Sequence, residues 1–180
     1  VVNSMSKAFA MTGWRIGFAA GPKKLISAMT NFQSHSASNP NSIAQRASLE
    51  ALTNPIKDEN IAAMVEEFSK RRDYMVRRIN SINNLSCYKP KGSFYVMLNI
   101  SKTFDKKCED KVITDSTSFA EALLEKYKVA VVPGVAFGTD NFVRLSYAKS
   151  IRSIKKGLDR IEEFVKSLED VEKPFKKAVI

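Results

Sequence analysis

The sequence predicts an α/β protein in which the end of one α/β domain leads through a long helix into a second, α+β domain. Short β-rich stretches alternate with helical periodicity along the chain. One apolar stripe at helical spacing runs from about residue 55 to residue 83, and the composition becomes β-rich immediately after it. We therefore assign residues 1–55 to the first domain and residues 56–180 to the second.

Length and composition limit the class of protein. A chain of 180 residues with 44% hydrophobic content can bury a real core. No apolar run approaches the roughly 20 residues that a membrane span needs, and the N-terminus does not have the pattern of a secretory signal. It opens within a strand-like stretch, so we expect the chain to begin in the middle of a domain.

The cysteines and the single histidine give little support for metal or disulfide chemistry. Cys87 and Cys108 do not have CxxC spacing, and His35 is the only histidine. This pattern argues against a disulfide scaffold and against a metal site, and it fits a reducing cytoplasm.

The net charge of +10 comes from 29 basic and 19 acidic residues. Such an excess is found in proteins that bind nucleic acid, acidic membranes or anionic substrates. The densest basic segment is residues 70–78, where helical spacing brings Arg71, Tyr74 and Arg78 together. We interpret it as a solvated helix face, because no nucleic-acid-binding motif accompanies it.

The first 55 residues predict two short strands followed by two helices. Residues 1–6 fit a buried strand, and residues 13–21 fit a second strand bounded by glycines. Helical spacing covers residues 23–34, and residues 34–42 form a polar loop. Asn39 and Pro40 suit the N-cap and first residue of a helix that ends near residue 52.

The remaining elements follow the long helix in order. Residues 87–101 are β-rich around a Pro-Lys-Gly turn, and residues 102–115 form a charged loop. Ser116 or Ser118 can cap the next helix. Residues 129–138 predict a strand and turn, residues 141–148 another strand, and the apolar positions from Ile151 to Leu168 a final helix.

A group of chemically useful side chains lies near the N-terminus. The stretch is NSMSKAFAMTGWRIG, residues 3–17. Burial favours the neutral, nucleophilic form of a lysine amine, so a buried Lys7 can form a Schiff base with an aldehyde. Arg15 offers a fork of donors for phosphate oxygens, and Ser4 and Ser6 add hydroxyl donors. Together they suit pyridoxal 5′-phosphate, which carries both an aldehyde and a phosphate.

The spacing alone leaves an ordinary reading open. A surface lysine, with Arg15 packed over Trp14, would explain the same residues without any cofactor. The serine-lysine spacing is too short a pattern to decide between the two.

The same stretch closely resembles the pyridoxal-phosphate attachment motif of class I/II aminotransferases. The resemblance continues in order through GPKKLISAM, QSHSASNPNSIAQRASLEAL, KPKGSFYVML, VAVVPGVAFG and VRLSYA. It covers nearly all 180 residues and is strongest to bacterial and archaeal aspartate aminotransferases. It implies the C-terminal part of a fold type I pyridoxal-phosphate enzyme.

The resemblance implies a role for five residues. Lys7 would bind the cofactor as a Schiff base and then move the substrate's Cα proton. Arg15 and Ser4 would bind the cofactor phosphate, with Ser6 a weaker candidate beside them. Arg144 would clamp the α-carboxylate of the substrate, although taken alone it could equally be a surface residue in a salt bridge. The implied reaction moves an amino group from a 2-amino acid such as aspartate to a 2-oxo acid such as 2-oxoglutarate.

Two further positions have weaker implied roles. Phe94 matches an aromatic near the family's substrate pocket, but a core aromatic on a strand is as good an interpretation. The loop containing His35 resembles the segment that reaches the neighbouring subunit's active site in the homodimeric family. No membrane or nucleic acid is expected as a partner.

Family members are about twice as long as this chain. The half without a counterpart supplies the aromatic that stacks on the cofactor and the aspartate paired to its pyridine nitrogen, so we expect this polypeptide alone to be inactive. Two other functions stay open. One is a lyase of the same fold, and the other is a non-catalytic regulatory module that contacts an anionic partner through Arg71 and Arg78.

Overall fold

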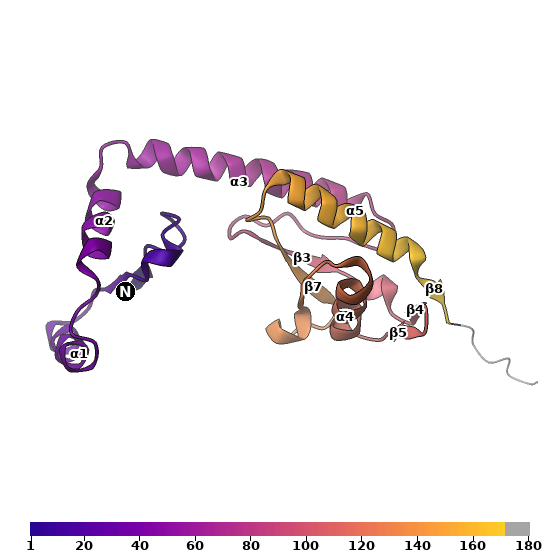
Figure 1. Ribbon diagram of the computed structural model, residues 1–180, viewed down its shortest axis with the longest axis horizontal. Helices are drawn as coiled ribbons and strands as arrows, with labels where there is room; N and C mark the ends of the chain where they lie inside the picture. Colours follow the sequence, from indigo (N-terminus) through magenta and orange to yellow (C-terminus); the bar gives the residue numbers. More distant parts are fainter. Residues whose placement is uncertain (172–180) are drawn as a thin grey trace, which may run out of the picture. The chain divides into compact units, whose positions relative to one another are not determined.

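The computed structural model describes residues 1–171, which form two compact units (Figure 1). The first unit is Val1–Glu66, the second begins at Glu67, and the division falls inside helix α3 (Lys57–Asn80). The domain boundary after residue 55 remains a prediction.

The first unit is built on an antiparallel hairpin of β1 (Val2–Ser4) and β2 (Gly17–Ala19). A short 3₁₀ helix, η1 (Thr12–Trp14), lies in the loop between them, and α1 (Lys23–Ser36) and α2 (Ser42–Thr53) follow. The expectation of a buried first strand is wrong, because all three residues of β1 are exposed. The buried residues of this unit are Met5, Met11, Ala44 and Ser48, too few to cover the hairpin.

The start of α2 differs from the sequence-based expectation. Asn41, rather than Asn39, is the N-cap, and its Oδ1 accepts hydrogen bonds from the backbone N–H groups of Ile43 (2.9 Å) and Ala44 (3.2 Å). Asn39 instead donates from its side chain to the carbonyl of Pro40. An N-cap side chain usually accepts from the N–H groups two or three residues after it, and Asn41 does so.

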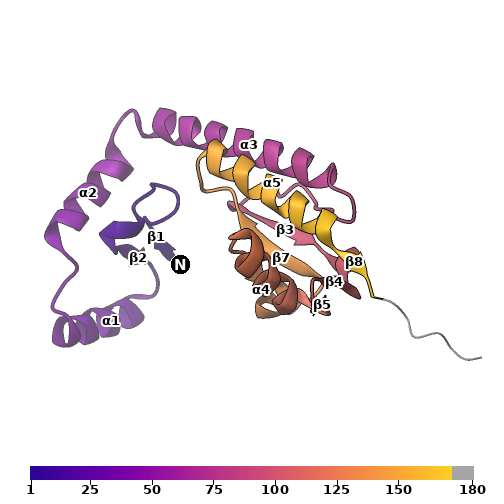
Figure 2. The ribbon, with the colours of Figure 1, turned by 45° about the vertical axis from the view of Figure 1, so that its right-hand side comes forward.

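The second unit contains an antiparallel sheet whose strand order is β3 (Tyr95–Asn99), β7 (Phe142–Ser146), β6 (Val132–Pro133). The pairs Val96↔Leu145 and Leu98↔Val143 lie on one face and are buried. The alternate residues of both strands, including Arg144, lie on the other face and are only half-buried. Figure 2 shows β3 and β7 side by side beneath α5.

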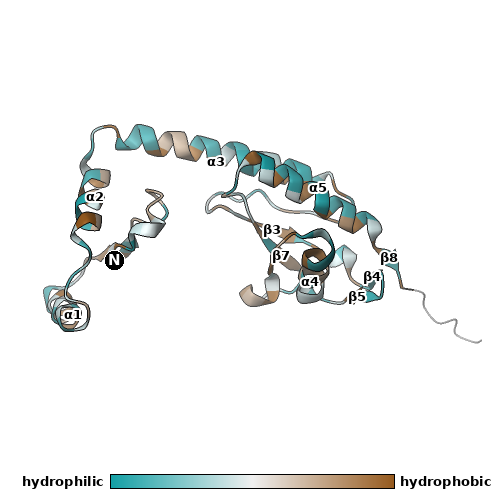
Figure 3. Cartoon of the chain, viewed as in Figure 1, coloured by the Kyte–Doolittle hydropathy of each residue, from teal (hydrophilic) through white to brown (hydrophobic). Residues whose placement is uncertain are grey.

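Three helices supply the rest of this core: the end of α3, α4 (Ser116–Tyr127) and α5 (Ile151–Ser167). Phe119 of α4 and Phe164 of α5 pack edge to face with ring centroids 5.1 Å apart. Figure 3 shows hydrophilic residues along the visible sides of α3 and α5, as expected for amphipathic helices. The buried helix residues are Met75, Ile79, Phe119, Ala122, Leu123, Ile154, Leu158, Ile161, Phe164 and Val165.

The charged segment 102–115 is not the predicted loop. It contains a 3₁₀ helix, η2 (Ser101–Thr103), and a hairpin of β4 (Lys106–Cys108) and β5 (Lys111–Ile113). A third short strand, β8 (Glu169–Asp170), pairs with β4, and Lys107 and Glu169 form a salt bridge of 3.5 Å across that pair. Cys108 and Ile113 are buried while the lysines remain partly exposed, so each short strand has a single buried residue, at its end, and carries no clear strand signal in the sequence.

The basic segment 70–78 makes salt bridges along helix α3 and to α5. Arg71 bonds Glu67 at 2.8 Å, one helical turn away, and Arg78 bonds Asp159 at 3.3 Å and also Glu162. Hydrogen bonding to Glu162 is the main cause that raises the pKa of Arg78. These contacts pair the basic side chains with acidic neighbours, and Arg71 and Arg78 are half-buried, so the face is less solvated than expected.

Within residues 1–171, no helix is long and apolar enough to cross a membrane. The same residues contain no group of three or more histidine, cysteine or acidic side chains placed to hold a metal ion.

Candidate functional site

The β1–β2 hairpin brings Ser4, Ser6 and Arg15 to one end of the first unit. Ser4 pairs with Gly17, and the N–H of Met5 donates to the carbonyl of Ile16 at 3.3 Å. Residues 5–16 therefore form a closed loop with Ser6 and Lys7 near its start and Arg15 near its end.

The two serine hydroxyls lie against each other. Ser4 Oγ donates to Ser6 Oγ at 2.9 Å and accepts from the backbone N–H of Ser6 at 3.1 Å. Across the loop, Thr12 Oγ1 donates to the carbonyl of Ser6 at 2.9 Å. These bonds fix the backbone on which Lys7 follows and bring two hydroxyls together.

Arg15 has an unusual backbone conformation. Its φ of 53° and ψ of 50° lie in the left-handed region, where a residue with a Cβ is strained by about 1–2 kcal/mol. The Nη1 atom of its exposed side chain donates to the carbonyl of Thr12 at 2.9 Å. Among residues 1–171 Arg15 has no salt bridge to a carboxylate, so its charge is available to an anion.

Lys7 is exposed, so the expectation that its amine is buried is wrong for this chain. The loop that carries it buries only its two methionines, Met5 (1% exposed) and Met11 (7%). They anchor the loop to its own unit without covering the lysine.

Arg144 belongs to the second unit, on the half-buried face of β7. Its Cζ lies 4.1 Å from the ring centroid of Tyr95 and 4.5 Å from that of Phe137. The alternative of a surface salt bridge is not observed in the described part of the chain, where no carboxylate lies within bonding distance of Arg144.

The two weaker candidates have different surroundings. Phe94 is half-buried against the core, with its ring centroid 4.5 Å from Tyr95 and 6.4 Å from Phe68. His35 lies exposed in the last turn of α1.

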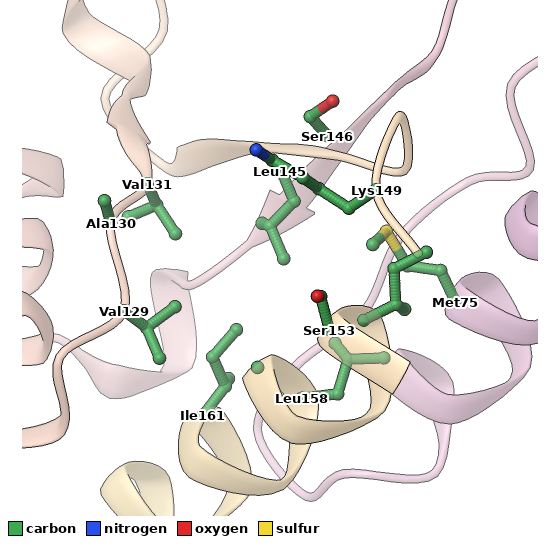
Figure 4. A pocket seen from close by; sticks show the side chains of 12 residues that line it. Met75, Val129, Ala130, Val131, Leu145, Ser146, Lys149, Ser153, Leu158 and Ile161 are labelled. Carbon is green, nitrogen blue, oxygen red and sulfur yellow. The ribbon is translucent and has the colours of Figure 1, made fainter. Parts of the chain in front are cut away.

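A separate pocket of about 130 Å³ opens between β7, the segment before β6, and α5 (Figure 4). Its lining is mainly apolar, and Figure 4 shows Val129, Leu145 and Ile161 facing one another across it. None of the five predicted site residues lines it.

Sequence reasoning missed the two rings beside Arg144 and the role of Thr12. The signal for Tyr95 was available, because it occupies a position of β3 that faces away from the core. Phe137 and Thr12 act through loop geometry, which spacing along the chain does not reveal.

The family model described as aminotransferase class I and II matches residues 1–161, most of the chain and both units. The chain belongs to the class I and II aminotransferase family.

Curated relatives agree with this assignment. The probable aspartate/prephenate aminotransferase of Rickettsia typhi is 46% identical over 168 residues, 93% of this chain and 42% of that protein. The aspartate aminotransferase of Bacillus subtilis is 44% identical over 165 residues, 92% of this chain and 40% of the relative.

Solved structures of the family have the same fold. The crystal structure of the aspartate aminotransferase from Rhizobium meliloti matches with a TM-score of 0.89 and 44% identity, covering 94% of this chain and 42% of that one. The aromatic aminotransferase from Pyrococcus horikoshii matches with a TM-score of 0.79 and 36% identity, covering 92% and 42%. The mixed α/β fold is thus that of the fold type I pyridoxal-phosphate enzymes.

The chain spans about 40% of the length of the curated relatives it matches. More than half of each relative therefore has no counterpart here.

The side chains of the hairpin loop fit the chemistry of pyridoxal 5′-phosphate. Hydroxyls at Ser4 and Ser6 and the guanidinium of Arg15 are donors of the kind that a phosphate dianion requires, and Lys7 supplies a primary amine for an aldehyde.

Proposed function

We propose that this chain is part of a pyridoxal-phosphate-dependent aminotransferase. The enzyme transfers an amino group from aspartate, or a similar 2-amino acid, to a 2-oxo acid such as 2-oxoglutarate. The observation that carries the proposal is the placement of Ser4, Ser6, Lys7 and Arg15 on one hydrogen-bonded loop. Membership of the class I and II aminotransferase family supports it.

The residues of the hairpin and its loop would hold different parts of the cofactor. Arg15 and the hydroxyls of Ser4 and Ser6 would bind its phosphate, and the amine of Lys7 would hold its aldehyde. When bound, pyridoxal 5′-phosphate would supply an electron-withdrawing ring that stabilises negative charge at the substrate's Cα. Lys7 Nζ would accept the proton from that Cα.

Arg144 positions the substrate. A guanidinium accepts a carboxylate through two parallel N–H···O bonds, so it fixes both the position and the orientation of an amino acid. The strand β7 that carries Arg144 is the central strand of its sheet, which makes the clamp rigid.

The proposal extends to the compartment and the oligomeric state of the enzyme. We infer a cytoplasmic homodimer whose substrates are amino acids and 2-oxo acids. The free cysteines Cys87 and Cys108 fit a reducing compartment. Because the matched relatives are more than twice as long, activity requires more polypeptide than these 180 residues.

A chimera tests the proposal directly. The chain replaces the segment that it matches in the Rhizobium meliloti aspartate aminotransferase, and the purified protein is assayed with aspartate and 2-oxoglutarate. We expect turnover with formation of glutamate and a 2-oxo acid. Release of ammonia in place of a new amino acid would indicate the lyase alternative and contradict transfer.

The matched variants are Lys7→Ala and Lys24→Ala, both at exposed lysines of the first unit. Lys7→Ala should lower turnover by at least about 10³-fold, since it removes both the covalent attachment and the proton carrier. Lys24→Ala should leave turnover unchanged. Equal activity of the two variants would overturn the assignment of Lys7.

A further inference from the structure

The guanidinium of Arg144 lies against two aromatic rings that come from opposite sides of its strand. Tyr95 belongs to β3 and Phe137 to η3 (Gly134–Phe137), which directly follows β6. In the sheet order β3-β7-β6, strand β7 is central, so one ring comes from a neighbouring strand and the other from the short helix that follows the second neighbour. The distances from Cζ, 4.1 and 4.5 Å, are within the range of a cation–π contact.

Register and packing fix the position of Tyr95. Met97 pairs with Arg144 and Tyr95 pairs with Ser146, so Tyr95 is the diagonal neighbour of Arg144 on the same face. The ring of Tyr95 packs against Phe94 at 4.5 Å, and Phe94 packs in turn against Phe68. The ring of Tyr95 is therefore held in place by its packing against Phe94.

Backbone geometry fixes the position of Phe137. The N–H of Gly138, at a φ of 77°, donates to the carbonyl of Val135 at 3.1 Å. The N–H of Val135 itself donates to Ser116 Oγ at 3.2 Å. Phe137 is 46% exposed, yet these bonds hold the short helix that carries it.

The rings hold the cation without satisfying its N–H groups. Aromatic faces attract a guanidinium but offer no lone pairs, and no carboxylate in residues 1–171 bonds Arg144. The two rings also restrict the rotamers of the Arg144 side chain before a ligand binds. Less conformational entropy is then lost on binding. The arrangement leaves a guanidinium held between two rings, with no carboxylate partner among the described residues of its unit.

We propose that Tyr95 and Phe137 are positioning residues that hold the Arg144 guanidinium ready for a substrate carboxylate. This inference rests on the proposed function, which assigns the carboxylate to Arg144. Aspartate and 2-oxoglutarate both carry an α-carboxylate, so an Arg144 held by Tyr95 and Phe137 serves both halves of the reaction.

The experiment uses the full 180-residue chain labelled with ¹⁵N-arginine. The Nε–Hε signal of Arg144, assigned with Arg144→Lys, is followed by heteronuclear NOE and during a succinate titration. We expect an ordered Nε in the wild type, and a mobile one in Tyr95→Leu and Phe137→Leu with succinate bound roughly threefold to tenfold more weakly. The conservative variants Tyr95→Phe and Phe137→Tyr should restore both readouts.

Phe142→Leu is the matched control. Phe142 lies on the same face of β7 as Arg144, is half-buried, and makes no cation–π contact with it. Phe142→Leu should change neither readout. If Tyr95→Leu and Phe137→Leu acted by loosening the sheet in general, Phe142→Leu would change both readouts to the same extent.

The two proposals fail in different measurements. An Arg144 Nε that is as mobile in the wild type as in the leucine variants would overturn the positioning role of Tyr95 and Phe137. An ordered Nε whose signal does not shift at any succinate concentration would instead overturn the binding of a carboxylate by Arg144. The proposed function of Arg144 would then fail, and with it the reason for positioning its side chain.

Discussion

At the scale of single residues, the candidate site consists of polar side chains on the β1–β2 hairpin and its loop, where Lys7 is exposed. The sequence motif located Ser4, Ser6 and Arg15, and the hairpin brings them to one end of a unit. The burial of Lys7 was not predicted correctly, because burial depends on what covers a residue rather than on its neighbours in sequence. The rings around Arg144 also come from distant segments, which spacing cannot reveal.

Gly134 is a position where only glycine fits. A Cβ there would lie 2.1 Å from the carbonyl oxygen of Thr139 and 2.2 Å from that of Phe142, and backbone atoms cannot move away cheaply. We expect Gly134→Ala to lower the free energy of unfolding by at least about 3 kcal/mol in urea titrations. Gly92→Ala, where a Cβ meets no atom within 4 Å, is the control and should have little effect.

Asp73 should make stability depend on pH in the acid range. Hydrogen bonds from Arg72 and then Lys89 lower the pKa of Asp73 to about 2. A folded-state pKa below the unfolded value of about 3.9 gives stability that is present above pH 4 and is lost as the pH falls toward 2.

The test compares wild type with Asp73→Asn in urea unfolding from pH 6 to pH 2. The wild type should be more stable at pH 6, and the difference should vanish near pH 2. Asp110→Asn changes an exposed aspartate that has no salt bridge within residues 1–171, and its difference from wild type should not vary in this way. A constant difference for Asp73→Asn would contradict the lowered pKa.

At the scale of elements, long periodic segments were predicted well and short polar ones were not. The final helix was expected from Ile151 onward, and α5 begins there because Ser150 caps it by accepting from the N–H of Ser153. The hairpin of β4 and β5 was not predicted, because each of its three-residue strands buries only one residue and the rest of the segment is rich in charge. The cap of α4 was expected at Ser116 or Ser118, and both positions are wrong.

The cap of α4 is Asp115. Its Oδ1 accepts from the N–H of Ser118 at 2.7 Å, and Ser118 Oγ accepts from the N–H of Asp115 at 3.1 Å, which forms a capping box. We expect Asp115→Ala to lower the free energy of unfolding by roughly 1 kcal/mol. Thr117→Ala, whose exposed side chain makes no cap, should not lower it, and equal losses in the two variants would refute the assignment.

Gly157 lies in the interior of α5, where it weakens the helix. A Cβ at this position meets no atom within 4 Å, so alanine fits without strain. We expect Gly157→Ala to raise the free energy of unfolding by about 0.5–1 kcal/mol through lower backbone entropy of the unfolded chain. A loss of stability in the same urea titration would show that the space beside Gly157 is not open.

At the scale of the whole chain, the two units differ in how much they bury. The second unit has a continuous core of strands and three helices, whereas the first buries three apolar side chains, Met5, Met11 and Ala44. The fold class and the order of the long elements followed from sequence. The difference in burial did not, because apolar residues in the first unit look the same in sequence whether they are covered or not.

Hydrogen exchange should reveal this difference. Amides of β3, β7 and α5 should exchange slowly, because they open only when the core opens. Amides of β1 and β2 should exchange faster by at least about 10²-fold, since few buried contacts oppose their opening. Equal protection in the two units, measured by mass spectrometry on the intact chain, would contradict this reading of their stability.

The most direct test of the proposed function locates the cofactor on the chain. The chimera with the Rhizobium meliloti relative is loaded with pyridoxal 5′-phosphate, reduced with borohydride, digested and mapped by mass spectrometry. The account predicts a pyridoxyl group on Lys7 and none on the other lysines. A reduced adduct elsewhere, or a Lys7→Ala chimera that retains both the adduct and aspartate turnover, would contradict it.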